Sequence, residues 1–169
     1  QSMVRVGARS FFFVAAVVAP LACQAQAICP VSLPSALDLD KKRAELIGAY
    51  PPFPDPVSIS ALRQQGSKHA QYETLIIGGW RSEIDGRCRS VKTAETQVTR
   101  LNLRGDLTPN QKLACEEAIS DERLLCDSKN KETSPYYELL REVEAFNLQN
   151  FKDLNAAYND CTRKDECNK

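Results

Sequence analysis

The stretch SKHAQYETLIIGGWRSEIDGRCRSVKTAETQVTRLNL, residues 67–103, decides the fold. Its apolar residues recur at steps of three and four, a spacing that places them on one stripe of a helix. The stripe consists of Tyr72, Leu75, Ile76, Gly79, Trp80, Ile84, Cys88, Val91, Ala94, Val98 and Leu101. The segment therefore predicts one long amphipathic helix, or two helices separated by a kink.

Two adjacent glycines, Gly78 and Gly79, are the weak point of this helix. Each glycine costs about 1 kcal/mol relative to alanine in a helix interior, so residues 72–80 could instead form a short strand and a turn. The stripe continues in register on both sides of the glycines, which favours the helix. In that helix the glycines would let another backbone approach closely beside Trp80.

The segment NLRGDLTPNQ, residues 102–111, carries the signals of a tight turn between two helices. Gly105 can stop the first helix, Thr108 can cap the second, and Pro109 suits its first position. Gln111, three residues after the cap, completes a capping box. The sequence therefore predicts an antiparallel helical hairpin.

Two more helices follow this turn. The first, from residue 109 to about 129, has one face formed by Leu113, Cys115, Ala118, Ile119, Glu122 and Cys126. The second starts at Ser134 and Pro135, runs to about Cys161, and has a stripe of Tyr136, Leu139, Leu140, Val143, Phe146, Phe151, Leu154, Ala157 and Tyr158.

Prolines shape the segment that precedes the long helix. Residues 28–34 are expected to be extended, and Ser35 to cap a helix that stops at Pro51. The apolar side of that helix would consist of Leu37, Ala44, Ile47 and Tyr50. The connector YPPFPDP, residues 50–56, is stiff, and Ser58 or Ser60 can cap a short helix that ends at Gln65.

These elements predict an all-α fold. We expect a small disulfide-stapled helical bundle of about four helices, arranged as antiparallel hairpins and forming a single domain over residues 28–169. The composition, 43% hydrophobic and 26% charged, is ordinary for a globular protein.

Residues 1–27 read as a tag scar and a signal peptide. Gln1 and Ser2 precede the only methionine, and a basic start is followed by an apolar run over residues 11–19 and by AQA at residues 25–27. Pro20 interrupts the apolar run too early for a membrane span, which favours a processed leader. Cleavage after Ala27 is one expected outcome. Lipidation of Cys23 is the other, because PLAC resembles the signal of bacterial lipoproteins.

Setting Cys23 aside leaves an even set of cysteines: Cys29, Cys88, Cys115, Cys126, Cys161 and Cys167. An even count in an exported chain predicts disulfides and a periplasmic or secreted location. The chain has no C-x-x-C motif and a single histidine, His69, so we expect no metal site and no cofactor.

The spacing of the cysteines limits their pairing. In one helix Cys115 and Cys126 would lie ~16 Å apart, too far for a disulfide. Cys88 and Cys126 are equidistant from Leu107 at the centre of the hairpin turn, which predicts a bond between them. A local Cys161–Cys167 bond would leave Cys29 for Cys115. The alternative joins Cys29 to Cys161 or Cys167.

Charge argues against nucleic acid as a partner. Without Arg5 and Arg9 the chain carries 20 basic residues against 22 acidic ones, a net charge of −2. Binding to phosphates requires clustered lysine and arginine side chains. We therefore expect a protein partner and not a nucleic acid. We also expect no segment that spans a membrane, because Pro20 interrupts the apolar run of the leader.

Signals for catalysis are few. His69, near the expected start of the long helix, is the only histidine, and no nucleophile elbow, zinc, P-loop or dinucleotide motif occurs. The leading hypothesis is a non-enzymatic protein-binding module, such as an inhibitor or immunity protein against a hydrolytic toxin, by analogy of class alone. The candidate partner-binding residues are Tyr50, Phe53, His69 and Trp80.

Two alternatives stay open. One is a small secreted hydrolase or effector that uses His69 with a nearby carboxylate. The other is a structural protein of the cell envelope, anchored by a lipid at Cys23.

Overall fold

The computed structural model describes residues 28–126, 134–164 and 167, and these residues contain helices and no strand. The helices are α1 (Leu39–Gly48), α2 (Ile59–Gln71), the π-helical segment η1 (Tyr72–Ile77), α3 (Gly78–Arg104), α4 (Pro109–Cys126) and α5 (Pro135–Lys164). The all-α class is confirmed. The tag scar, the signal peptide and Cys23 lie outside the described residues.

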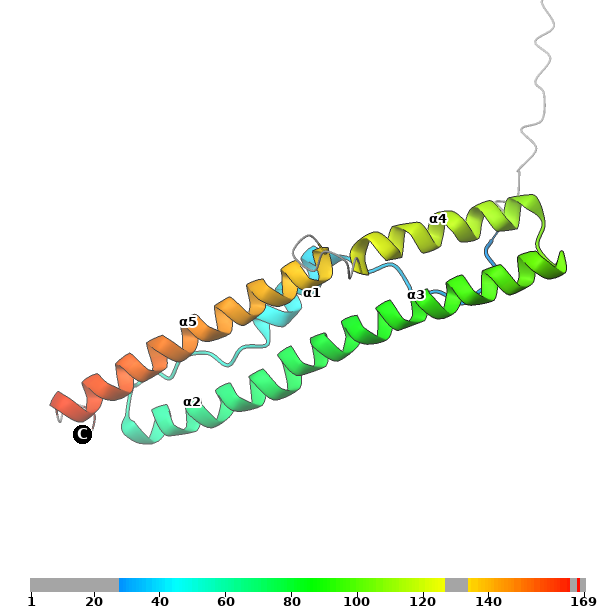
Figure 1. The fold of residues 1–169 in the computed structure, drawn as a ribbon. Helices are drawn as coiled ribbons and strands as arrows, with labels where there is room; N and C mark the ends of the chain where they lie inside the picture. Colours follow the sequence, from blue (N-terminus) through cyan, green and yellow to red (C-terminus); the bar gives the residue numbers. More distant parts are fainter. Residues whose placement is uncertain (1–27, 127–133, 165–166, 168–169) are drawn as a thin grey trace, which may run out of the picture.

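One long rod organises the molecule. The elements α2, η1 and α3 follow one another without a break, and the rod runs the length of the molecule in Figure 1. Helix α5 packs antiparallel to α2 and α4 packs antiparallel to α3, so the two lie end to end along the rod, while α1 packs on α5. The result is an elongated arrangement in which the continuous rod forms one antiparallel pair with α5 and another with α4.

The π-helical segment changes which side chains are buried. Tyr72, Ile77 and Trp80 are buried, so the stripe takes a step of five residues through η1. A π turn accommodates this step because it adds one residue to the helical turn. Leu75, which the three-and-four spacing placed on the stripe, is 68% exposed.

The glycines do not bring a second backbone close to Trp80, so that expectation is wrong. Gly79 is exposed, and a Cβ built on it would meet nothing within 4 Å. A Cβ on Gly78 would meet only the carbonyl oxygen of Glu73 in the same rod, at an ordinary 3.7 Å. The additional residue of the π turn explains this result, because it rotates Gly79 away from the core.

The predicted turn between α3 and α4 is confirmed. Gly105 has a φ of 73°, and Asp106 donates its backbone N–H to the carbonyl of Leu101 at 2.9 Å. The Thr108 hydroxyl accepts from the Gln111 N–H at 3.1 Å, and the Gln111 side chain accepts from the Thr108 N–H at 3.0 Å. This reciprocal capping fixes the direction in which α4 leaves the turn.

Helix α1 begins later than predicted, because Asp38 and not Ser35 caps it. The Asp38 carboxylate accepts from the N–H groups of Asp40 at 3.0 Å and Lys41 at 3.1 Å, so one side chain satisfies two helix-end donors. Leu46 supplies the buried side chain of this helix, whereas Ala44 is exposed.

Helix α2 begins as predicted but does not end at Gln65. The Ser58 hydroxyl accepts from the Ala61 N–H at 3.1 Å. Gln65 is buried within the helix and donates its side-chain amide to the Pro51 carbonyl at 2.9 Å, which holds the proline connector against α2. His69 is consequently inside the continuous rod and not near a helix start.

On α4 and α5, two further residues assigned to apolar faces are exposed instead. Leu113 is 63% exposed, because α4 turns Cys115, Ile119, Glu122 and Cys126 toward the core. Phe151 is 44% exposed, because its ring lies at the surface against His69.

Three disulfides link the described residues, with Cα–Cα distances of 4.7 Å for Cys29–Cys115, 5.5 Å for Cys88–Cys126 and 5.2 Å for Cys161–Cys167. These are the three pairs that the spacing of the cysteines favoured. The alternative partners of Cys29 are wrong, because the end of α5 lies at the opposite end of the rod from the α3–α4 turn. Disulfides of this kind indicate an oxidising compartment.

The core runs along the rod in two parts. The main cluster surrounds Trp80, Ile84, Tyr136 and Val143. A smaller one joins Leu62 to Leu154 and Cys161 at the other end. Among the described helices, none has the length and apolar character that a membrane crossing requires.

Candidate functional site

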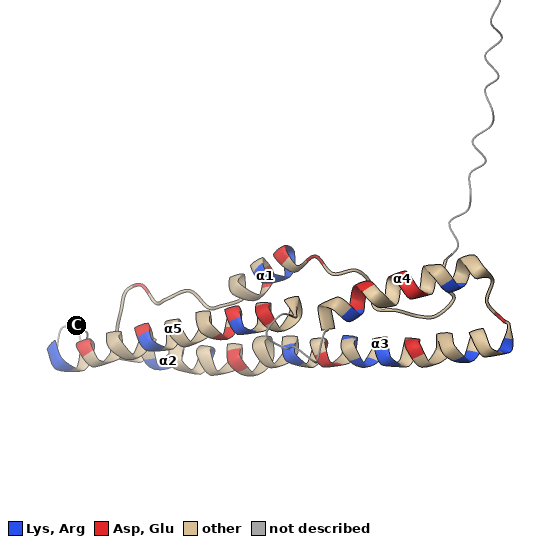
Figure 2. Ribbon diagram, turned by 45° about the horizontal axis from the view of Figure 1, so that its top comes forward, with Lys and Arg blue, Asp and Glu red and all other residues tan. Residues whose placement is uncertain are grey.

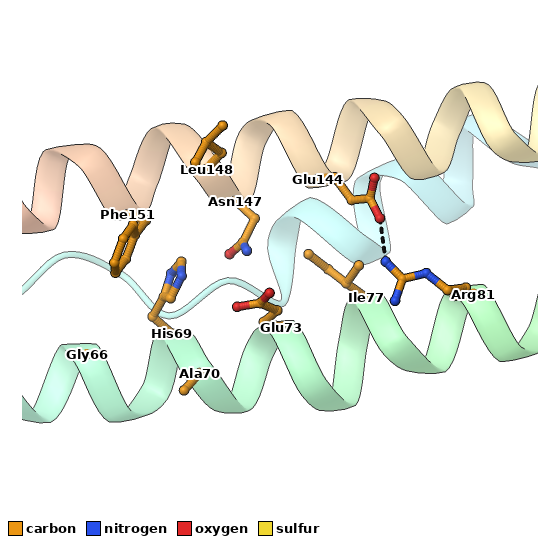
Figure 3. A pocket seen from close by; sticks show the side chains of 10 residues that line it. All are labelled: Gly66, His69, Ala70, Glu73, Ile77, Arg81, Glu144, Asn147, Leu148 and Phe151. Atoms are coloured by element: carbon orange, nitrogen blue, oxygen red, sulfur yellow. Dashed lines mark hydrogen bonds and ion pairs between the residues drawn. The ribbon is translucent and has the colours of Figure 1, made fainter. Parts of the chain in front are cut away.

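A groove of about 560 Å³ lies between the rod and α5, beside the π turn (Figure 3). Its walls come from α2, η1 and the first turns of α3 on one side and from the middle of α5 on the other. The lining residues are Gly66, His69, Ala70, Glu73, Ile77, Arg81, Glu144, Asn147, Leu148 and Phe151.

The local sequence explains why a groove forms here. Gly66 and Ala70 lie one helical turn apart on α2 and leave space where larger side chains would fill the interface. The π turn then places Ile77 in the core and Glu73 at the opening. Long π segments are uncommon and occur frequently at functional sites.

His69 lies at one end of the groove and is only 6% exposed. Its Nδ1 lies 3.1 Å from the phenol oxygen of Tyr50, and its ring stacks on Phe151 with centroids 5.1 Å apart. Tyr50 in turn makes edge contacts with the rings of Tyr72 and Phe146. His69 is therefore held by an aromatic cluster formed by Tyr50, Tyr72, Phe146 and Phe151.

The phenols of this cluster stay neutral at physiological pH. Burial raises the pKa of Tyr72 to about 12, and its hydroxyl donates to the carbonyl of Leu46 at 2.8 Å. Burial, together with the nearby charge of Asp153, also raises the pKa of Tyr50. The hydroxyl of Tyr50 thus meets His69 as a neutral hydrogen-bonding group.

Polar groups of opposite walls meet in the middle of the groove. Figure 3 shows His69, Glu73 and Asn147 pointing toward one another. Asn147 is 8% exposed, and its Oδ1 is buried without a hydrogen-bond partner among the described residues. Arg81 and Glu144 form an ion pair at 2.5 Å across the other end of the groove.

The structure places the predicted partner-binding residues in different environments. Trp80 is 2% exposed and belongs to the main core, so its assignment to a binding surface is wrong. Phe53 is 45% exposed in the proline connector, Tyr50 is half-buried, and His69 lines the groove. Only His69 of these residues belongs to the groove.

A second cluster of polar groups lies in the core between α3, α4 and α5. The Tyr136 hydroxyl donates to Glu122 at 2.6 Å, and the Arg87 guanidinium lies 3.5 Å from the same carboxylate. Arg87 also donates to the carbonyl of Ser35 at 2.9 Å. Burial, helped by Glu122, raises the pKa of Tyr136. Every group has a partner, which is typical of a structural network.

A second cavity, of about 570 Å³, lies where α3, α4 and the start of α5 meet. It is lined by the Cys88–Cys126 disulfide and by Leu124, which is 67% exposed. Arg89, Lys92 and Arg123 lie around it together with Asp85 and Glu95. Figure 2 shows both signs of charge interspersed along α3 and α5, so neither helix is uniformly basic.

Two further findings bear on chemistry at the groove. Within the described ranges, no three His, Cys, Asp or Glu residues are grouped so that they could hold a metal ion. Nδ1 of His69 has the Tyr50 phenol as its hydrogen-bond partner, while the Glu73 carboxylate, the kind of group that the hydrolase hypothesis pairs with His69, faces the histidine in the groove.

No protein-family model, curated protein or solved structure matches this chain.

Proposed function

We propose that this chain is an exported, disulfide-bonded helical protein that acts by binding another protein, as an inhibitor or immunity protein against a hydrolytic toxin. The observation that supports this best is the composition of the groove. Exposed apolar side chains, Leu148 at 53% and Phe151 at 44%, flank the buried polar groups of His69 and Asn147. A concave, largely apolar surface with a few placed polar groups suits the specific recognition of a partner's side chain.

The framework of the groove favours binding without rearrangement. Its walls are turns of two long helices, the rod and α5, and not loops. The aromatic cluster fixes His69, and the Arg81–Glu144 pair joins the walls at the other end. A surface held in this way loses little conformational entropy when a partner docks.

Capture from the organism that produces the protein tests this proposal. The chain, oxidised to its disulfide form, is immobilised beside two variants that each place an arginine on an exposed leucine. Leu148→Arg places a charged side chain at the edge of the groove, whereas Leu124→Arg, on α4, changes the second cavity and serves as the control. We expect one protein to be retained by the unaltered chain and by the control, and to be lost with Leu148→Arg.

Purified partner and chain are then mixed to measure function. An inhibitor abolishes the partner's hydrolytic activity at a stoichiometric ratio, and Leu148→Arg fails to do so. Retention of no protein, or equal retention by all three forms, contradicts the proposal. Mass spectrometry of the mature N-terminus addresses the alternative of an anchored envelope protein, since acylated Cys23 establishes an anchor and a start at Ile28 removes one.

A further inference from the structure

The middle of the groove brings the side chains of an asparagine and a glutamate together. The Asn147 side chain extends from α5 toward the Glu73 side chain on the rod (Figure 3). Asn147 is more than nine-tenths buried, and its Oδ1 has no partner among the described residues. A carboxylate only accepts hydrogen bonds, and so does the oxygen of an amide, whereas the amide nitrogen donates them. Neither oxygen receives a hydrogen bond from the described residues.

The charge of the groove is negative. Three charged side chains line it, and Arg81 and Glu144 neutralise each other through their ion pair. Glu73 remains, with no ion pair in the part of the chain that the structure describes. A cationic donor consequently fits the groove better than a neutral one.

Apolar walls surround this acceptor pair. Phe151 and Leu148 lie on the α5 side, and Ile77 and Ala70 lie on the rod side. Such walls suit the aliphatic stem of a long basic side chain, which prefers apolar surroundings while its charged end stays hydrogen-bonded. An exposed aromatic ring also attracts a cation to its face.

We propose that the groove receives an arginine side chain of the partner protein, a step that rests on the function proposed above. The planar guanidinium carries several N–H donors in a fixed fork, so it can donate to Glu73 and Asn147 at the same time. Its methylene stem packs between Phe151 and Ile77. Lysine carries the charge but lacks the fork, and therefore binds more weakly.

A small probe tests the arginine directly. N-acetyl-arginine methylamide is titrated into the isotope-labelled chain, and the side-chain amide resonances of Asn147 are followed by NMR. N-acetyl-citrulline methylamide, which has the same shape without the charge, is the matched probe. We expect saturable shifts at Asn147 with the arginine probe and binding about tenfold weaker with citrulline, because charge-assisted hydrogen bonds are the stronger ones.

Two variants locate the site. Glu73→Gln should weaken binding of the arginine probe about tenfold, and its exposed position leaves the fold intact. Glu117→Gln, an exposed carboxylate on α4, should leave it unchanged. Absence of shifts at Asn147, equal binding of both probes, or an effect of Glu117→Gln as large as that of Glu73→Gln overturns the inference.

The captured partner separates this inference from the proposed function. If the partner binds Glu73→Gln as tightly as the unaltered chain, the arginine site is rejected while the binding function stands. If the unaltered chain captures no partner, the proposed function fails, and the titration with the arginine probe still decides the chemistry of the groove.

Discussion

The phenol oxygen of Tyr136, in the first turn of α5, lies 2.6 Å from Oε1 of Glu122 in α4, and both residues are buried. This hydrogen bond joins two helices that lie end to end on the rod. Arg87, from the rod itself, lies beside both groups. The junction of the three helices therefore depends on a buried carboxylate that must keep its donors.

Removing the phenol donor tests this network. Tyr136→Phe leaves Glu122 buried with a weaker set of partners, and we expect a loss of about 1–3 kcal/mol in the free energy of unfolding. Tyr158→Phe, at a half-buried phenol that has no hydrogen bond to any residue that the structure describes, is the control and should change stability little. Urea denaturation measures both. Equal effects of the two substitutions would show that the network contributes nothing specific.

The disulfides should contribute unequally. Cys29 and Cys115 are 86 residues apart in the sequence, and Cys161 and Cys167 are 6 apart. If disulfides act mainly on the entropy of the unfolded chain, replacing the first pair by alanines costs about 4–5 kcal/mol and replacing the second about 2 kcal/mol. Thermal unfolding measures the order, and peptide mapping without reductant checks the pairs. A reversed order contradicts this account.

The phenol of Tyr72 should lose its proton at a higher pH than an exposed tyrosine does. Burial raises its pKa to about 12, against 10.0 in the unfolded chain, so the folded protein binds more protons than the unfolded one between these values. The stability that this group contributes is complete below pH 10 and is lost as the pH rises toward 12. Ultraviolet absorbance of the phenolate follows the titration. Removal of the late phase by Tyr72→Phe assigns it, and persistence of that phase refutes the assignment.

His69 has a structural role that an alanine substitution reveals. His69→Ala removes the contact with Tyr50 and the stacking on Phe151, and we expect a loss of about 1–3 kcal/mol in unfolding free energy. Lys68→Ala, at the exposed neighbour, is the control. If His69→Ala leaves stability unchanged and abolishes a hydrolytic activity, the histidine is catalytic and the binding proposal loses its main support.

Deleting one residue tests the π turn. Removal of the exposed Thr74 shortens η1 to an ordinary helical turn and keeps both halves of the rod in register, so we expect a folded protein of similar stability. Removal of the exposed Ser82 from α3 instead rotates one half of the rod by about 100° relative to the other, which should unfold it. Circular dichroism and thermal unfolding distinguish the two. If both deletions destabilise the protein equally, the π turn does not contain an additional residue that the rod can lose.

Elements with local chemical signals could be predicted from the sequence. Gly105, Thr108 and Gln111 specify the α3–α4 turn through their own backbone and side-chain bonds, and the position of that turn then brings Cys88 opposite Cys126. The π turn carries no such signal. Residues 75–77 are all apolar, so an ordinary helical step appears satisfied, and only packing against α5 makes Ile77 the buried one.

The candidate site was predictable only in part. His69 attracts interest because histidine is the one side chain that titrates near neutral pH without perturbation. Glu73 and Asn147 look like ordinary surface residues of two amphipathic helices, and their approach depends on the register between the rod and α5, which no local pattern encodes. Trp80 shows the opposite error, because a large aromatic side chain suggests a binding surface and is here part of the core.

The distribution of disulfides along the rod makes its two halves unequal in cooperativity. The α3 half is tied to α4 by one bond, and α4 to the N-terminal arm by another, whereas within the described residues no covalent bond joins α2 to α5. The α2–α5 half can therefore separate in a subglobal opening while the other half stays native, and its amides should exchange hydrogen sooner. The groove lies in this half, so a ligand held between its walls would act as a clasp and slow that exchange.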